Sequence, residues 1–386
     1  MELKLIIGAD LVPTVSNYDA FRNKDLEYLL GDKLLALLSK VDLRIFNLEV
    51  PLVDAESPIT KCGPALIASP STIEGIKAIN PNLLTIANNH ILDQGEEGLI
   101  STMKLLNNHD IPYAGAGLTL KDAAKPYIFE QNGFKIGFYC CAEHEFSIAT
   151  SQSPGANPFD PFESLDHISQ LRKECDFVIT LYHGGKEHYR YPSPYLQKVC
   201  RKIIDKGSDI VICQHSHCIG CKEEWGNGTI VYGQGNFIFD DNESPFWQTG
   251  LLLEIQLDLK NKSVHISYIP LRKNKNKIRL AENEDGQEIL RGFEERSKDI
   301  LSKEFIESKY AEFSQNMISA YYGAFIGSLS NNIIYRIINK LSGYTLQKLM
   351  FKLLYKKKNK LTLQNFIECE AHRELLLRGL KNGFKK

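Results

Sequence analysis

The sequence predicts an α/β protein, and three observations support this fold class. Short apolar runs, such as Leu3 to Ile7 and Ile210 to Cys213, have the length and bulk of buried strands. Segments with helix-like leucine spacing, the first over residues 24–40, separate these runs. Several of the runs end in a carboxylate, an amide or a histidine. Strands that alternate with helices form largely parallel sheets, whose carboxyl ends meet at one edge and collect ligands there.

The first third of the chain alternates strand and helix. We expect strands at 3–7 and 42–49, a short strand ending before Asn88, and helices over 24–40, 71–79 and 96–107. Asn132 and Gly133 lie between two apolar runs, which is typical of a β-hairpin turn. The following loop, 145–162, is rich in Ser, Pro, Gly and Asn and is long enough to serve as a lid or substrate loop.

The same alternation continues and then gives way to a β-rich region. We expect helices over 164–174 and 195–206, strands at 176–183 and 210–213, and further strands as far as residue 269. From about residue 275 charge rises and helix formers dominate. The sequence therefore predicts a main domain over residues 1–272 and a helical, basic extension over residues 273–386.

Composition excludes several classes of protein but names no activity. The chain has 386 residues, of which 43% are hydrophobic and 24% charged, as in ordinary globular proteins. The overall charge of −1 hides 11 Lys and Arg against three Glu in residues 341–386, a net of +8 that leaves −9 elsewhere. This basic tail predicts either an anionic partner, such as a membrane surface or a polyanion, or a solvated helical face; no specific nucleic acid is expected.

The N-terminal residues and the cysteines predict the compartment. The start of the chain has an acidic residue early and no basic leader before a long apolar stretch, unlike a signal peptide. Nine scattered cysteines favour reduced thiols over a disulfide framework. We therefore expect a cytoplasmic protein, with a peripheral position at the membrane as the alternative.

Six residues at the predicted strand ends form a candidate metal site. Two carboxylates, one amide and three imidazoles make a mixed oxygen and nitrogen set that suits Mn, Fe or Zn. Each residue alone has a plain structural explanation, but their recurrence at strand ends favours a shared site. One or two divalent ions are expected, and a carboxylate would bridge two ions about 3.5 to 4 Å apart. The six candidate ligands are Asp10, Glu49, Asn89, His183, His215 and His217.

Further residues beside these ligands have the chemistry of catalysis. His90 can carry a proton, and Asp93 can orient its imidazole. Glu187 follows the His183 strand and would bind substrate or support His183. Lys61 and Lys186 would neutralise an anionic substrate, or else be ordinary surface charges.

The segment around His215 and His217 allows two interpretations. On an extended segment both rings would point the same way, giving one ligand to each of two ions. Cys218 and Cys221 have the spacing of half a zinc knuckle, but no second Cys-x-x-Cys pair completes it.

The motif set resembles the CapA-like family, named from capsule and poly-γ-glutamate biosynthesis, which is similar in fold to the calcineurin-like metallophosphoesterases. The likeness spans about residues 1–270. It implies a four-layer α/β/β/α sandwich with the site at the strand ends and a C-terminal helical appendage outside the family pattern. The motifs are Gly8-Ala-Asp10, Asn47-Leu-Glu49, Asn88-Asn-His90 with Asp93, His183-x-Gly-x-Glu187, His215-x-His217 and Gly235-Asn-Phe-Ile-Phe239.

The resemblance also implies a role for each ligand. Asp10 and His217 would hold one ion, while Asn89, His183 and His215 would hold the other, with Glu49 bridging. His90 would lie beside the ions as a proton donor or phosphate contact.

Two departures from the broader phosphoesterase pattern concern the first ion. Val12 stands where that pattern has a histidine, and Glu49 replaces an aspartate, so we expect a weakened first metal site.

The expected function is a metal-dependent hydrolase, of the phosphoesterase type, acting on an anionic small molecule or polymer in capsule or poly-γ-glutamate biosynthesis. Two alternatives remain open from the sequence. One is a non-catalytic polymer-synthesis scaffold that retains the metallophosphatase shell. The other is an amide hydrolase or transferase acting on γ-linked glutamate.

Overall fold

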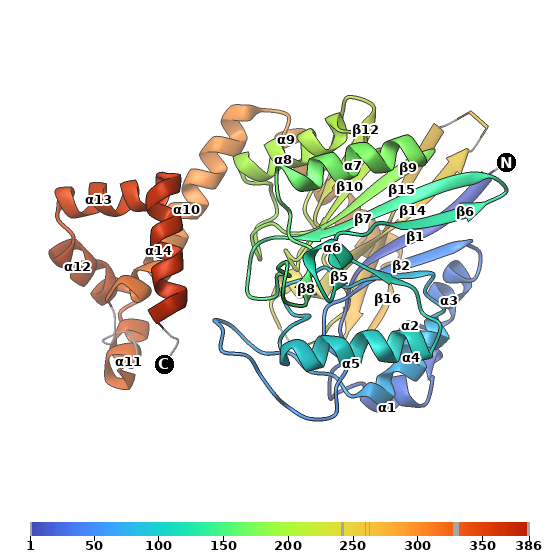
Figure 1. Ribbon diagram of the computed structural model, residues 1–386, viewed down its shortest axis with the longest axis horizontal. Helices are drawn as coiled ribbons and strands as arrows, with labels where there is room; N and C mark the ends of the chain where they lie inside the picture. Colours follow the sequence, from blue (N-terminus) through green and yellow to red (C-terminus); the bar gives the residue numbers. More distant parts are fainter. Residues whose placement is uncertain (1, 241–242, 259, 262, 327–331, 384–386) are drawn as a thin grey trace. The chain divides into compact units, whose positions relative to one another are not determined.

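Two stacked β-sheets with helices on their outer faces form the main body of the protein (Figure 1). The computed structural model describes residues 2–240, 243–258, 260–261, 263–326 and 332–383. Its chain divides into two compact units, residues 1–307 and 308–386, and each unit is described here by itself. The predicted four-layer α/β/β/α sandwich is confirmed in the first unit.

The centre of each sheet is made of parallel strands. In the first sheet β1, β2 and β3 run parallel, and in the second β7, β9, β10 and β12 do. The first sheet has the order β16 (Lys277–Leu280), β15 (Ser263–Asn274), β14 (Thr249–Asp258), β1 (Glu2–Leu11), β2 (Leu43–Leu48), β3 (Leu83–Thr85) and β4 (Tyr113–Ala114), with β13 (Asn236–Ile238) on β1. The second has the order β11 (Lys222–Trp225), β12 (Gly228–Tyr232), β10 (Ile210–Gln214), β9 (Phe177–His183), β7 (Phe134–Ala142) and β6 (Tyr127–Gln131). A small ribbon pairs β5 (Ala116–Gly117) with β8 (Gly155–Ala156).

Helices cover the outer face of each sheet. The first sheet packs against α1 (Tyr18–Arg22), α2 (Leu26–Leu30), α3 (Asp32–Leu38), α4 (Ile73–Ile79) and α5 (Gly95–Asn108). The second packs against α7 (Glu163–Glu174) and α8 (Pro194–Asp205), and Figure 1 shows these two helices on the opposite side from α4 and α5. A one-turn helix, α6 (Leu120–Ala123), follows β5, and two short 3₁₀ helices span Pro70–Thr72 and Pro245–Gln248.

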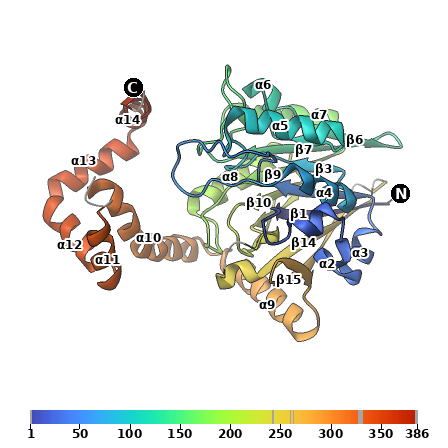
Figure 2. The same cartoon turned by 90° about the horizontal axis from the view of Figure 1, so that it is seen from below.

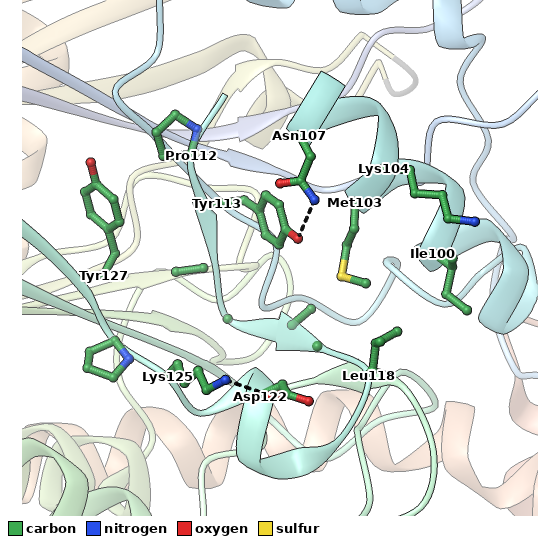
Figure 3. A pocket seen from close by; sticks show the side chains of 15 residues that line it. Ile100, Met103, Lys104, Asn107, Pro112, Tyr113, Leu118, Asp122, Lys125 and Tyr127 are labelled. Carbon is green, nitrogen blue, oxygen red and sulfur yellow. Dashed lines mark hydrogen bonds and ion pairs between the residues drawn. The ribbon is translucent and has the colours of Figure 1, made fainter. Parts of the chain in front are cut away.

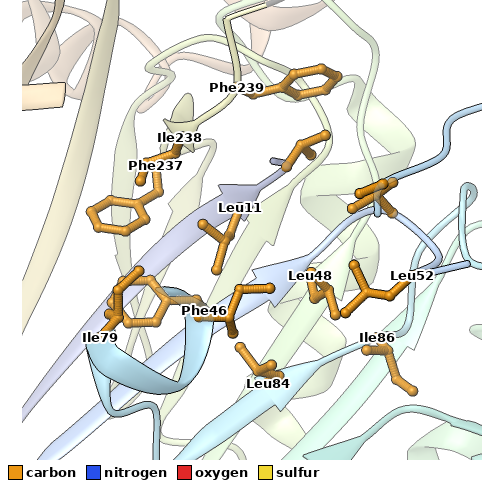
Figure 4. Packing of buried hydrophobic residues seen from close by; sticks show 14 of the residues in the cluster. Leu11, Phe46, Leu48, Leu52, Ile79, Leu84, Ile86, Phe237, Ile238 and Phe239 are labelled. Carbon is orange, nitrogen blue, oxygen red and sulfur yellow. The ribbon is translucent and has the colours of Figure 1, made fainter. Parts of the chain in front are cut away.

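Alternating side chains of the strands build two separate apolar layers. On β1, Leu5 and Ile7 face the second sheet, whereas Ile6 faces the helices. In the layer between the first sheet and its helices, the rings of Phe46 and Phe237 stack with centroids 4.6 Å apart (Figure 4). Because both faces of β1 and β2 are buried, these strands are apolar almost throughout, as is typical of the parallel centre of a sandwich. This rigid centre fixes where the strand ends lie.

Local details both confirm and correct the sequence expectations. The hairpin is confirmed, with Asn132 and Gly133 at positive φ in its turn. The single helix expected over residues 24–40 is wrong, since Gly31, at φ +74°, separates α2 from α3. Leucine spacing alone does not reveal this break, because a glycine is tolerated within helical patterns.

The main unit extends past residue 272, where the sequence placed its boundary. β15 runs to Asn274, β16 pairs with it, and α9 (Asn283–Asp299) packs on β15 and β11 (Figure 2). Phe293 of α9 is buried in the layer between the sheets and contacts the ring of Tyr268. Contacts therefore divide the chain between residues 307 and 308.

The C-terminal unit is helical. Its elements are α11 (Ile333–Leu341), α12 (Thr345–Leu354), α13 (Lys357–Glu368) and α14 (Glu370–Gly383), preceded by α10 (Lys303–Ile326), which begins in the first unit. In the part of the chain that the structure describes, every helix is too short or too polar to cross a bilayer.

Candidate metal centre

The structure brings all six predicted ligands to one edge, where the carboxyl ends of both sheets meet. Asp10 is the penultimate residue of β1, and Glu49 directly follows β2. His183 ends β9 in the other sheet, and Asn47 of β2 joins the two sheets at this edge. Its Nδ2 donates to Oδ1 of Asp10 over 2.7 Å and lies 3.2 Å from Nδ1 of His183.

Glu49 and Asp10 are fully buried carboxylates with too few donors. Three of their oxygens lack a hydrogen-bond partner of good geometry among the described residues. They are both Oε atoms of Glu49 and Oδ2 of Asp10. Nε2 of His183 lies 3.0 Å from Oε1 of Glu49, close enough for an ion pair if the imidazole were charged. Burial, and then the charge of Asp10, raises the pKa of Glu49 to about 8. Burying a carboxylate without a compensating charge costs free energy. A positive charge beside Asp10 and Glu49 would therefore stabilise the folded chain.

His183 and Asn89, which the sequence assigned to the same ion, lie close together. Nε2 of His183 is 3.0 Å from Oδ1 of Asn89. Burial lowers the pKa of His183 to about 4, and this outweighs the attraction of Asp10. At neutral pH the imidazole is therefore neutral, which is the form that binds a metal.

His215 and His217 do not lie on an extended segment, so that sequence expectation is wrong. Both residues have left-handed backbones, with φ of +82° and +50°, because β10 ends at Gln214 and the chain turns sharply. Their ring centroids are 6.0 Å apart. Potential ligand atoms of Glu49, His215 and His217 nevertheless all lie within 4.8 Å of one another. A buried Glu/His/His cluster is thus present.

The two histidines of this turn titrate in opposite directions. Burial and the neighbouring His183 lower the pKa of His215 far below its ordinary value, and its Nδ1 has no partner among the described residues. Burial also disfavours charge on His217, but Glu49 and Asp10 outweigh it and raise its pKa to about 9. Nδ1 of His217 lies 2.8 Å from Oδ1 of Asn236. Without a metal, the charged imidazole of His217 thus compensates part of the negative charge of Asp10 and Glu49.

The turn that carries these histidines packs tightly against other segments of the same chain. Ser216 Oγ donates to the carbonyl of Cys218 over 3.1 Å, and its own carbonyl accepts from the backbone N–H of His188. Gly233, at φ +113°, lies directly beneath: a Cβ there would come 2.6 Å from Ser216 Oγ. Only glycine leaves room for this turn.

His90 and Asp93 form a buried pair with Lys61. Nδ1 of His90 lies 2.6 Å from Oδ2 of Asp93, which also accepts from the backbone N–H of Leu66 over 2.6 Å. Lys61 makes a short ion pair with the other oxygen of Asp93, and its side chain is only 4% exposed. Lys61 therefore holds Asp93 in place, instead of being a surface charge. With Nδ1 engaged, Nε2 of His90 is the nitrogen left for a substrate atom.

Glu187 is placed differently from the other predicted residues. It lies exposed in the loop after β9 and, within the part of the chain that the structure describes, makes no hydrogen bond or ion pair with His183. Partial burial raises the pKa of its carboxyl, but the charges of His215 and His217 outweigh this and lower it. Glu187 therefore interacts with His215 and His217 through their charges, and it makes no hydrogen bond to either among the described residues.

Glu145 is a site residue that strand-end reasoning missed. It lies in the long loop after β7, where its Oε2 accepts a hydrogen bond from Nδ2 of Asn89 over 3.1 Å. Its Oε1 is 3.9 Å from Nε2 of His215. The same loop is anchored by Ser147, whose Oγ donates to the carbonyl of Asn89 over 2.6 Å. The signal available in the sequence was the position of Glu145 at the start of the predicted lid loop.

A large surface cavity lies away from this cluster. It has a volume of about 690 Å³ between α5, β4 and α6, where Asn107 Nδ2 donates to the hydroxyl of Tyr113 and Lys125 pairs with Asp122 (Figure 3). Among the described residues that line it, none is a predicted ligand. The candidate metal centre is therefore defined by its buried polar groups and not by this hollow.

Known proteins are similar to this chain in both sequence and fold. The chain is 30% identical over 181 residues to capsule biosynthesis protein CapA of Bacillus anthracis, covering 45% of this chain and 44% of that protein. It is 31% identical over 173 residues to PGA biosynthesis protein CapA of Bacillus subtilis, covering 44% of this chain and 45% of that protein. The matched part thus spans less than half the length of these curated relatives.

Two solved structures are similar at lower identity. A phosphatase from Mycoplasma pneumoniae matches with 15% identity and a TM-score of 0.45, over 71% of this chain and 95% of that one. The NAD nucleotidase of Haemophilus influenzae matches with 14% identity and a TM-score of 0.41, over 76% and 55%.

The family assignment follows from a match to most of the main unit. The model of the family described as bacterial capsule synthesis protein PGA_cap matches residues 4–241. That range contains all six predicted ligands and both sheets' parallel centres. The chain belongs to the PGA_cap family of bacterial capsule synthesis proteins.

Proposed function

We propose that this chain is a metal-dependent hydrolase of phosphate esters that works in the synthesis of a capsule or poly-γ-glutamate polymer. The observation that carries the proposal is that buried oxygens of Asp10 and Glu49 lack a hydrogen bond of good geometry and meet imidazoles of the opposite sheet. Nε2 of His183 lies 3.0 Å from Oε1 of Glu49, and Nδ1 of His217 lies 3.4 Å from Oδ2 of Asp10. A divalent cation would supply the missing compensation. The nitrogen and oxygen donors fit Mn, Fe or Zn.

Each ligand has a proposed place. Asp10 and His217 would hold one ion, Asn89, His183 and His215 the other, and Glu49 would be shared. Bound there, the ions supply the Lewis acidity that makes water a nucleophile near neutral pH.

The chain's own residues would position the substrate and move a proton. Asp93, fixed by Lys61 and the Leu66 N–H, holds Nδ1 of His90. Nε2 of His90 would then give a proton to the leaving oxygen, a role in which a positioned imidazole typically contributes about 10²- to 10⁴-fold. Lys186, beside Glu187 in the loop after β9, would attract an anionic small molecule or polymer.

Metal removal tests the proposal directly. Chain stripped by a chelator and reloaded with Mn or Zn is expected to hydrolyse nitrophenyl phosphate mono- or diesters at least about 100-fold faster than the stripped chain. A His183→Ala variant should lose both the metal measured by mass spectrometry and the turnover. His265→Ala, which removes an exposed histidine on β15, is the matched control and should keep both.

Other outcomes would select the alternatives. Equal rates before and after reloading would contradict the hydrolase. Absence of bound metal after gentle purification would favour the polymer-synthesis scaffold. Metal-dependent cleavage of γ-glutamyl amides without cleavage of phosphate esters would favour the amide hydrolase.

The contact of Glu145 with Asn89 makes a separate prediction. A Glu145→Gln variant keeps the length of the side chain but removes the negative charge beside Asn89 and His215. We expect the affinity for the second ion to fall about tenfold, as for other supporting carboxylates around metal ligands. Calorimetric titration of the stripped chain with Mn measures this change. An affinity equal to that of the unmodified chain would show that Glu145 plays no part in holding the ion.

A further inference from the structure

The first two helices of the C-terminal unit that follow α10 are built with polar groups inside. Asn339 of α11 and Gln347 of α12 are only 4% and 5% exposed. The backbone N–H of Gln347 donates to Oδ1 of Asn339 over 3.0 Å, and the two side chains also bond to each other. This pair fixes how α11 meets α12. The interior of a helical pair is normally apolar, so Asn339 and Gln347 occupy positions that apolar side chains would otherwise fill.

The apolar side chains of α11 face outward. Positions i, i+1, i+4, i+5 and i+8 of this helix lie on one face, opposite the buried Asn339. All five are exposed, by 48% to 83%. They are Ile333, Ile334, Ile337, Ile338 and Leu341.

α12 has the same arrangement twelve residues later. Leu349 and Leu353 are exposed by 52% and 67%, whereas Gln347 and Phe351 are buried. Basic residues lie along one edge of the exposed apolar face in both helices, since 3.6 residues per turn place each pair of cations on the same side of that face. These residues are Arg336 and Lys340 in α11, and Lys348 and Lys352 in α12.

The charge of this region has a single sign. From residue 313 to residue 367 the sequence has eight Lys and Arg and neither Asp nor Glu. Four of these cations gather at the start of α13, where Lys356, Lys357, Lys358 and Lys360 are all exposed. Exposed apolar residues beside unopposed cations are typical of helices that lie in the interface of an anionic bilayer.

We propose that α11 and α12, with the basic start of α13, bind the surface of an anionic phospholipid membrane. The apolar faces enter the boundary between headgroups and acyl chains, and the lysines contact the lipid phosphates. A soluble polyanion would use the cations but give no partner to the isoleucines and leucines. A second copy of the chain would cover the apolar faces but bring eight further cations against the first eight.

Vesicle sedimentation of the full chain tests this surface. Binding is expected to phosphatidylcholine vesicles that contain phosphatidylglycerol, to be weaker without phosphatidylglycerol, and to weaken as salt is raised. A Lys356→Gln, Lys357→Gln, Lys358→Gln variant should bind about 100-fold more weakly. An Ile333→Ser, Ile337→Ser, Leu341→Ser variant should also lose at least about 100-fold, and both should stay folded because the substituted side chains are exposed.

Matched controls come from the main unit. Lys40→Gln, Lys77→Gln, Lys121→Gln removes the same charge from exposed positions there. Val15→Ser, Leu118→Ser, Phe162→Ser removes exposed apolar side chains of similar size. Neither control should change vesicle binding by more than about twofold.

Three results would overturn the proposal. The first is binding to neutral and anionic vesicles that is equally weak. The second is binding to soluble poly-γ-glutamate that depends on the lysines but not on Ile333, Ile337 and Leu341, which would make the region a polyanion site. The third is a concentration-dependent dimer that the serine variant abolishes while vesicle binding is absent.

Discussion

A Glu49→Gln variant is expected to lose its metal and about 1000-fold in turnover, while the metal-stripped chain becomes more stable. Glu49 is fully buried, and neither of its oxygens has a hydrogen-bond partner among the described residues. In the absence of a cation, the attraction between its charge and the charged imidazole of His217 does not offset the cost of burying that charge beside Asp10, because the pKa of Glu49 remains raised. An amide of the same size removes that charge, although its own burial costs part of the gain.

The pKa of Glu49 gives this effect a pH dependence. The ordinary pKa of a glutamate is 4.5, and burial with the charge of Asp10 raises the pKa of Glu49 to about 8. A carboxyl whose pKa is raised by folding costs nothing below the unfolded value, where it is protonated in both states, and destabilises the folded chain increasingly as pH rises toward 8. At pH 8 we expect the stripped variant to gain about 2 kcal/mol in free energy of unfolding. At pH 4.5 the gain should vanish.

Urea unfolding of stripped chains at both pH values measures the change, and mass spectrometry measures the metal. Glu295→Gln, at an exposed position on α9, is the control and should change neither quantity. A stripped Glu49→Gln chain that is less stable than the unmodified chain at pH 8 would show that Glu49 is already compensated by the protein alone.

A His90→Asn variant is expected to keep its metal and to lose about 10²- to 10³-fold in turnover. The shorter amide can still donate to Asp93, but it places no group where Nε2 of His90 lies. The loss should depend on the leaving group, because proton donation matters most for a poor one. We expect a large deficit with alkyl phosphates and a small deficit with nitrophenyl phosphates.

Comparing kcat for the two ester classes, with metal content measured in parallel, separates proton transfer from a structural role. An equal deficit for both classes would show that His90 only shapes the site. His90 is preferable to Asp93 for this experiment, because removing the Asp93 charge would leave Lys61 buried without its ion-pair partner.

The α/β class and the strand ends could be predicted from the sequence because both depend on local rules, whereas the four-layer sandwich was expected from the family resemblance. Apolar runs such as β1 and β9 are buried on two faces. Parallel strands bring their carboxyl ends to one edge of the sheet, and this does not depend on the conformation of the loops. Asp10, Glu49 and His183 therefore lie where their strands place them.

Features set by long-range contacts were not predictable in this way. The left-handed turn at His215 and His217 packs closely against Gly233, and no local pattern reveals that neighbour. Glu145 reaches Asn89 from a loop, whose path depends on tertiary anchors such as Ser147. The sequence placed the end of the main unit at residue 272, before α9, for a similar reason. Most residues of α9 are polar or charged, and this pattern does not reveal that Phe293 is buried against the sheets.

The crowded turn above Gly233 has a consequence for how this site can vary. L-residues in left-handed conformations cost on the order of 1 kcal/mol each, and His215 and His217 both adopt them. The turn persists because the backbone beneath it lacks a side chain: even one methyl group at position 233 would press on Ser216, between the two histidines. A substitution at position 233 would therefore displace both His215 and His217. Position 233 is thus as intolerant of substitution as the ligands themselves, although it contacts neither ion nor substrate.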